Sequence, residues 1–339
     1  SLKKINVVFE QPDFLCTKFS KNKKINGSKI HKGDIEFLLK EAKKQLVLND
    51  SKKSIVHIFN YNYIVDGKTF AEEPIGVYAD SLTHEITFIS APKNNLKNIN
   101  QVFIDCDIEI ERLISRTFAL GVKLLNQKEL EFGASILDLG SEKISFGIFK
   151  NLALVHSITF PIGINHITKD ISKVCSLNLD ESENIRNNID FLFQNSQKIF
   201  DENDYLKKIY FIDSGFRKIS KNLILSVVKA RLDEIFDILK KQLIVPGFNL
   251  TSEINFLLVG GGSNLFNIEK CFINCFGSNV KKVDKNSSEK DRDLKENFAS
   301  CLGALEIIKD GWETEAIPEA VNQNIEKISF FAKIFKINR

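Results

Sequence analysis

Alternation of apolar and polar residues predicts the first strands of the chain. Residues 54 to 65 (SIVHIFNYNYIV) alternate, are rich in β-branched and aromatic side chains, and end at Asp66-Gly67, a pair typical of tight turns. Residues 82 to 90 (LTHEITFIS) have the same character and predict the partner strand. A shorter run at residues 5 to 9 predicts a strand near the beginning of the chain.

Between these strands the apolar residues change to helical spacing. Asp34 precedes five apolar positions that fall on one face of a helix: Ile35, Leu38, Leu39, Ala42 and Leu46. We therefore expect a helix here with Asp34 as its N-terminal cap. Together the strands and this helix predict a compact α+β module over residues 13 to 88.

The remainder of the chain mixes strands with longer helices. Helical spacing is predicted at residues 94 to 104, 115 to 126, 180 to 192, 221 to 243 and 296 to 308. Another helix, preceded by Gly163 and Asn165, is predicted from Ile167, Ile171 and Val174. Strands are predicted at 134 to 139, 143 to 149, 152 to 160 and 255 to 259. Residues 284 to 295 are almost wholly polar and predict a solvated loop. A strand, a hairpin, a strand and then a helix are typical of the opening of an actin-type lobe.

Composition excludes several classes of protein. The 339 residues are 43% hydrophobic, enough for one large two-lobed core or two ordinary domains. The 47 basic and 44 acidic residues nearly balance, so we expect no nucleic-acid partner, whose binding would need many phosphate contacts. No apolar stretch of about 18 residues occurs. The sequence therefore predicts neither a membrane span nor a secretory signal.

The cysteines and histidines do not suggest catalysis or metal binding. The six cysteines are scattered, and Cys271 and Cys275 lie in an apolar, helical context without histidines at ligand spacing. We interpret them as reduced thiols and expect no metal site. His57 and His156 lie in strand patterns and are interpreted as structural residues, so no catalytic residue is predicted. Because Met is absent even at position 1, we treat Ser1 as an internal residue.

Four blocks of residues follow one another along the chain. They are His57 with Asp66 and Pro74-Ile75-Gly76-Val77; Asp138-Leu139-Gly140 with residues 161 to 171 (PIGINHITKDI); Leu258-Val259-Gly260-Gly261-Gly262-Ser263; and a basic, aromatic C-terminal tail. Together, in this order, they resemble the FtsA family of actin-like cell division proteins. The second block is the most specific. The position of the inserted module before residue 94 fits FtsA and its pilus-assembly relative PilM, and the tail favours FtsA.

This resemblance implies an α/β, actin-like fold of two lobes with an inserted α+β subdomain called 1C. The implied divisions are 1–12, a remnant of subdomain 1A; 13–88, 1C; 89–133, 1A; 134–179, 2A; 180–245, 2B; 246–295, 2A; 296–312, 1A again; 313–323, a linker; and 324–339, a membrane-targeting helix.

The resemblance also implies ATP with magnesium as the cofactor of the full-length protein. It places the nucleotide beside Asp138, Gly140, Glu183, Arg186, Gly260, Gly261, Gly262 and Ser263. Glycines allow backbone N–H groups to approach phosphates, although a glycine turn between strand and helix explains the triplet equally well.

The phosphate turn departs from the family. The usual Asp-Ile-Gly-Gly-Gly-Thr-Thr-Asp is replaced here by residues 138 to 145 (DLGSEKIS). Glu142 would repel a phosphate, unless it faced magnesium or Lys143 offset it. The family's first phosphate loop belongs to a hairpin with no counterpart here, so we expect no secure cofactor in this fragment, at most weak ATP binding and no useful hydrolysis.

Function is likewise implied by the resemblance. A member of the family anchors FtsZ filaments, the Z ring, to the cytoplasmic face of the inner membrane at the division septum, forms filaments with itself and recruits later division proteins. Its subdomain 2B binds the FtsZ C-terminal tail, for which the basic candidates here are Arg217, Lys218, Lys229 and Arg231. Each is equally explained as a solvated surface residue. The alternatives are a PilM-like scaffold of a pilus inner-membrane platform and an active actin-type ATPase.

Residues 324 to 339 (NIEKISFFAKIFKINR) predict an amphipathic helix in the membrane interface. The predicted membrane-binding residues are Ile325, Ile328, Phe331 and Phe335 on the apolar face, with Lys333 and Lys336 beside them. Basic residues favour an anionic membrane surface. The alternative is a helix packed on the protein body, and the polar linker with Pro318 favours the membrane.

Overall fold

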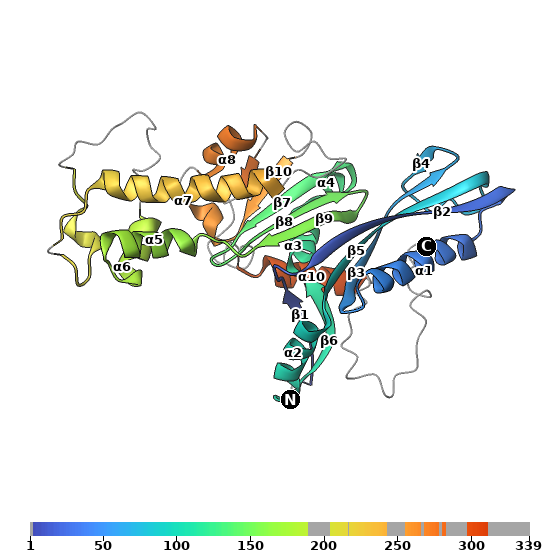
Figure 1. The fold of residues 1–339 in the computed structure, drawn as a ribbon, viewed down its shortest axis with the longest axis horizontal. Helices are drawn as coiled ribbons and strands as arrows, with labels where there is room; N and C mark the ends of the chain where they lie inside the picture. Colours follow the sequence, from blue (N-terminus) through green and yellow to red (C-terminus); the bar gives the residue numbers. More distant parts are fainter. Residues whose placement is uncertain are drawn as a thin grey trace. The chain divides into compact units, whose positions relative to one another are not determined.

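A computed structural model describes most of the chain (Figure 1). It describes residues 3–188, 204–215, 217–242, 255–265, 268–277, 280–282 and 297–310. The chain forms two compact units. The first contains residues 1–136, 145–159 and 284–339, and the second contains residues 137–144 and 160–283.

An antiparallel sheet with one covering helix forms the inserted module of the first unit. Its strands are β2 (Leu15–Lys29), β3 (Lys53–Val65), β4 (Lys68–Phe70) and β5 (Tyr78–Pro92), in the order β2-β5-β3-β4. Helix α1 (Lys32–Asn49) buries all five predicted apolar residues, including Leu38 and Ala42, against this sheet. Burial of one apolar helix face on a sheet is the main source of stability for such a layer.

The beginning of α1 corrects the predicted cap. The N-cap is His31, and Asp34 is the third residue of the helix. Asp34 still serves the helix terminus, because its Oδ2 accepts the backbone N–H of His31 at 2.7 Å. Its other oxygen accepts Lys23 Nζ at 2.6 Å. An acidic side chain in the first helical turn also faces the positive end of the helix dipole.

Parallel pairing joins two further strands of the first unit, β1 (Lys4–Phe9) and β6 (Glu109–Ser115). The accompanying helices are α2 (Lys93–Ile104), α3 (Arg116–Leu124), α4 (Gln127–Phe132) and α10 (Ala299–Asp310). Helices α3 and α10 pack closely. A Cβ on Gly303 would lie only 1.9 Å from the carbonyl oxygen of Ala119. Glycine at position 303 therefore sets the approach of these helices.

Five strands form the largest sheet, in the order β11-β10-β7-β8-β9. They are β7 (Ala134–Leu139), β8 (Ile144–Lys150), β9 (Ala153–Phe160), β10 (Asn255–Val259) and β11 (Val280–Lys282). Every residue of β7 is buried, as its near-continuous apolar sequence requires. Strand β7 ends at Leu139, so the turn that follows it begins directly after a buried strand.

Helices dominate the second unit. They are α5 (Asn165–Cys175), α6 (Leu179–Asn187), α7 (Lys221–Gln242), α8 (Ile268–Phe276) and the short 3-10 turns η2 (Lys208–Tyr210) and η3 (Gly261–Asn264). Helices α5 and α7 lie side by side (Figure 1). Edge-on phenylalanine rings join α7 to α8, among them Phe236 and Phe272 with centroids 4.9 Å apart.

Most predicted elements coincide with observed ones, but some were missed. Strands β2, β4, β6 and β11 and the short helix α4 were not predicted. The helix predicted from residue 180 is α6, which ends at Asn187, and its predicted last residues lie outside the described part of the chain. The polar segment 284 to 295 also lies outside it. The helical context of Cys271 and Cys275 is confirmed as α8.

Candidate functional site

The turn after β10 lies against the end of β7, which brings Gly260 next to Asp138. Gly260 has a φ of 81°, and a Cβ there would lie 2.3 Å from Oδ1 of Asp138 and 2.9 Å from the carbonyl oxygen of Leu139. A Cβ on Gly262 would likewise lie 2.8 Å from the Cβ of Leu139. Only glycine fits at these two positions, so packing within the unit already explains them.

Gly261 and Ser263 differ from their neighbours. A Cβ on Gly261 would meet nothing within 4 Å, and the residue is exposed. The hydroxyl of Ser263 donates to the carbonyl oxygen of Gly260 at 2.7 Å and so closes the turn on itself. Of the predicted adenosine motif, Gly261 is therefore the residue whose backbone has open space around it.

The turn after β7 is closed onto the start of α5. The backbone N–H of Ile164 donates to Gly140 at 3.0 Å, and that of Asn165 donates to Ser141 at 2.8 Å. Gly163 makes this approach possible, because a Cβ there would lie 2.3 Å from the Ser141 carbonyl oxygen. Backbone donors at the start of a helix are the groups that usually bind phosphate. Here two of them are bonded to the neighbouring turn.

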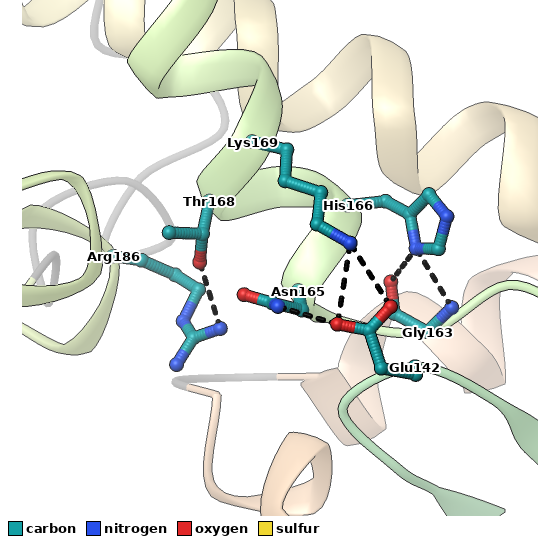
Figure 2. A network of polar contacts seen from close by, with 7 residues as sticks. All are labelled: Glu142, Gly163, Asn165, His166, Thr168, Lys169 and Arg186. Atoms are coloured by element: carbon teal, nitrogen blue, oxygen red, sulfur yellow. Dashed lines mark hydrogen bonds and ion pairs between the residues drawn. The ribbon is translucent and has the colours of Figure 1, made fainter. Parts of the chain in front are cut away.

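Glu142 completes this contact through its side chain (Figure 2). Its Oε1 accepts the side-chain amide of Asn165 at 2.6 Å, and its Oε2 accepts Lys169 Nζ at 3.0 Å. The hydrogen bond from Asn165, followed by that from Lys169, lowers the pKa of Glu142. The carboxylate is therefore charged at neutral pH and pairs with a cation of its own chain.

Glu183 and Arg186, predicted to line the nucleotide pocket, are brought together on α6. Arg186 Nη2 donates to Glu183 at 2.8 Å, and its Nη1 donates to Thr168 Oγ1 on α5 at 2.9 Å. The guanidinium thus joins α5 to α6 (Figure 2). This arrangement is a structural link between two helices, with Glu183 at its exposed edge.

The four basic candidates lie in two different environments. Arg231 is bound to Asp170 by two hydrogen bonds, one of them 2.9 Å from its Nη2, and it also pairs with Glu234. Arg217 is exposed, but its guanidinium donates to the carbonyl oxygen of Cys175 at 3.2 Å. Lys218 and Lys229 are exposed. The lysines are therefore better placed than the arginines to meet an acidic partner.

Sequence reasoning missed Glu181, the most completely bonded carboxylate of the second unit. It is fully buried, and its Oε1 accepts three consecutive backbone N–H groups, those of Ile212, Asp213 and Ser214, at 2.8 to 2.9 Å. Its Oε2 accepts the Ser214 hydroxyl at 2.9 Å.

These contacts fix both the charge of Glu181 and the loop it binds. Burial alone would raise the pKa of Glu181, but the hydrogen bonds outweigh it and lower the pKa to about 2. Its position three residues after the N-cap Asn178 is the sequence signal of a helix start. That signal contains nothing about a loop more than 30 residues away.

The predicted membrane-binding residues 324 to 339 lie outside the described residues. Among the described helices, none is both long and apolar enough to cross a bilayer.

Two family models match the chain. The model of cell division protein FtsA matches residues 135–303, and the model of the SHS2 domain inserted in FtsA matches residues 15–90. The second match covers most of the β2–β5 module.

Curated relatives and one solved structure agree with these matches. FtsA of Agrobacterium fabrum is 22% identical over 261 residues, which is 76% of this chain and 58% of that protein. FtsA of Buchnera aphidicola from Acyrthosiphon pisum is 23% identical over 327 residues, 92% of this chain and 74% of that protein. The chain thus spans little more than half the length of the first of these relatives.

A structure of the PilM-PilN type IV pilus biogenesis complex has a TM-score of 0.59 at 13% identity and covers 90% of this chain and 79% of the matched one. At this identity the likeness shows the fold alone. The fold is α/β and actin-like, with the SHS2 module inserted, and the chain belongs to the FtsA family of cell division proteins.

Proposed function

We propose that the chain is an adaptor that attaches FtsZ filaments to the cytoplasmic face of the inner membrane during division. The observation that carries the proposal is family membership, supported by a surface on the second unit and by the composition of the tail. In this proposal it acts peripherally at the septum, forms filaments with itself and recruits later division proteins. It contributes binding surfaces and performs no chemical step.

The surface that we propose for the FtsZ tail combines apolar and basic residues of the second unit. Ile209 and Ile212 are 79% and 69% exposed, which is unusual for isoleucine. The backbone N–H of Ile212 is bound by Glu181, which fixes its position before a partner arrives, and Ile209 lies three residues before it in η2. Lys218 lies a few residues further along the chain and is exposed. A short peptide with apolar and acidic residues matches this surface.

Electrostatics adds range and salt dependence to this binding. Lys218 and Lys229 are exposed lysines of the basic set, and salt screens their attraction over about 10 Å at 0.1 M. We therefore expect binding of an FtsZ C-terminal peptide to weaken as salt rises. Arg231 is a poor choice for charge reversal, because a carboxylate there would face Asp170 and Glu234 and disturb the unit itself.

We propose that the other end of the adaptor is the segment 324 to 339. A short helix this apolar and basic is not stable alone in water, and folding on an anionic bilayer removes its apolar face from water. Phe331 and Phe335 supply the apolar anchor, and Lys333 and Lys336 meet the lipid head groups.

The nucleotide that the fold family implies fits this chain on the adenosine side and not on the phosphate side. Gly261 leaves open space beside the turn after β10. The turn after β7 does not fit phosphate, because its neighbouring backbone donors are bonded within the chain and Glu142 brings a negative charge to it. We therefore propose a role for the chain that requires no ATP turnover.

Two binding assays with matched controls test the adaptor. Co-sedimentation with anionic vesicles should be lost in the double variant Phe331→Glu, Phe335→Glu and kept in Phe37→Glu, a substitution of an exposed aromatic residue on α1. Binding of the FtsZ peptide should weaken about tenfold in Lys218→Glu, Lys229→Glu, in line with two lost surface pairs.

The control for the peptide assay is Lys240→Glu, Lys241→Glu, which reverses two exposed charges at the other end of α7. Equal vesicle binding by wild type and the phenylalanine variant would contradict the membrane anchor. It would instead favour a scaffold of the pilus-platform type, which needs no lipid-binding tail.

A further inference from the structure

The start of α5 has the donors of an anion-binding site. A helix N-terminus carries partial positive charge, and here the side-chain amide of Asn165 and the ammonium group of Lys169 lie on the same side of it (Figure 2). A lysine, an amide and helix N–H groups are a common combination for binding phosphate or carboxylate. The question is which anion they bind.

In this chain the anion that they bind is a carboxylate of the chain itself, the side chain of Glu142. Glu142 reaches across from the turn after β7 and accepts from both side chains, with Lys169 Nζ at 3.2 Å from Oε1 as well as 3.0 Å from Oε2. The backbone of the same turn takes the helix N–H groups, because Gly140 and Ser141 accept from Ile164 and Asn165. The donors therefore have partners within residues 140 to 142.

A second feature shows that the turn is built to lie there. Gly163 has space for a hydrogen atom only, since a Cβ would lie 2.3 Å from the Ser141 oxygen and 2.7 Å from the Gly140 oxygen. The imidazole Nδ1 of His166 lies 3.2 Å from the Gly163 backbone nitrogen, which further fixes this position. Tight backbone packing and a side-chain ion pair thus act on the same contact.

We propose that Glu142 is a built-in substitute for a phosphate group at the start of α5, which keeps the turn of residues 140 to 143 closed on the helix without any ligand. The substitution is chemical: a carboxylate has the charge and the two acceptor oxygens needed to pair with Lys169 and Asn165. An incoming phosphate must displace Glu142 and then remain beside its negative charge. The turn is therefore insensitive to nucleotide, whether or not the chain acts as an adaptor.

Hydrogen exchange of the backbone amides of Ile164 and Asn165 measures closure of the turn directly. In the wild type we expect identical exchange with no ligand, with millimolar magnesium-ATP and with millimolar pyrophosphate. In Glu142→Gln we expect exchange about threefold faster or more, because the ion pair is lost, and a return toward the wild-type rate when pyrophosphate is added.

Two further variants make the result specific. Lys169→Gln should loosen the turn as Glu142→Gln does, but pyrophosphate should not restore it, because the cation is gone. Glu109→Gln removes a surface carboxylate that pairs with Lys4 at 3.4 Å in the first unit, and it should leave the turn unchanged. Slower exchange in the wild type with either ligand would overturn the proposal. So would wild-type exchange in Glu142→Gln, or a loosened Glu142→Gln turn that pyrophosphate does not restore.

Discussion

His84 lies in β5 directly opposite Tyr63 of β3, and the two rings stack with centroids 4.4 Å apart. Its side chain is fully buried, and neither ring nitrogen has a hydrogen-bond partner among the described residues. Burial lowers the pKa of His84 to about 4. The imidazole is therefore neutral in the folded module, and it must leave the core or carry an unfavourable charge in acid.

We predict that acid destabilises the module through this residue. The folded pKa lies below the unfolded value of about 6.5, so the contribution of His84 is complete above pH 6.5 and is lost as pH falls toward 4. Between pH 6.5 and 5 the loss is about 2 kcal/mol. Urea unfolding at several pH values measures it.

The matched variants for this pH dependence are His84→Leu and His31→Asn. His84→Leu should flatten the dependence without removing it, because burial also lowers the pKa of His57 to about 3 and, with Lys18, that of His156 to about 4. His31→Asn changes an exposed histidine to another good N-cap and should keep the wild-type slope. An unchanged slope in His84→Leu would mean that His84 is not the titrating group.

Gly260 and Gly261 are neighbours that differ in the space available for a side chain, and we predict different effects of replacing them. Gly260→Ala places a Cβ 2.3 Å from Asp138 Oδ1 at a φ of 81°, and we expect a loss of about 2 kcal/mol or more in unfolding free energy. Gly261→Ala has open space and should change stability by less than about 0.5 kcal/mol. Equal effects of the two variants in thermal unfolding would contradict the described turn.

At the scale of elements, Glu181 connects α6 to the loop that carries Ile212. We predict that Glu181→Gln lowers stability by about 1.5 to 3 kcal/mol, because the hydrogen bonds it weakens are made to a buried charge. Asp180→Asn removes an exposed charge from the same helical turn and should cost about 0.5 kcal/mol. Hydrogen exchange at residues 212 to 214 should rise in the first variant alone. Continued protection there would show that other contacts hold the loop.

Periodic apolar elements were predictable from the sequence, and elements formed by distant pairing were not. Helix α7 spans Lys221–Gln242 where residues 221 to 243 were predicted, because one continuous face of it is buried. Strand β2 is rich in lysine and buries only Phe19 and Ile25, so its pattern does not resemble a strand. It forms because β5 offers backbone partners along most of its length, and its lysines suit an edge strand.

The candidate site divides in the same way. The glycine turn and the altered residues 141 to 143 were visible in the sequence, and so was the possibility of repulsion by Glu142. The pairing of Glu142 with Lys169 was not, because 27 residues separate them and only the closure of the turn brings them together. Similarly, Arg231 is a residue type that often binds acidic peptides. The sequence did not show that the fold places Asp170 of α5 beside it.

At the scale of the whole molecule, we predict negligible ATP turnover. The turn that would approach the phosphates presents Glu142, and its carbonyl oxygens already accept the backbone N–H groups of Ile164 and Asn165 at the start of α5. A purified sample should show no magnesium-dependent phosphate release above background. Turnover of about 1 per second or faster would contradict this account of the turn.

The most direct test of the adaptor asks whether the chain can connect its two proposed partners. A fluorescent protein fused to the FtsZ C-terminal tail is mixed with anionic vesicles, with or without the chain, and vesicle-bound fluorescence is measured. We predict recruitment only when the chain is present, and its loss in either Phe331→Glu, Phe335→Glu or Lys218→Glu, Lys229→Glu. The absence of recruitment by the wild-type chain, or recruitment that survives in the phenylalanine variant, would contradict the adaptor function.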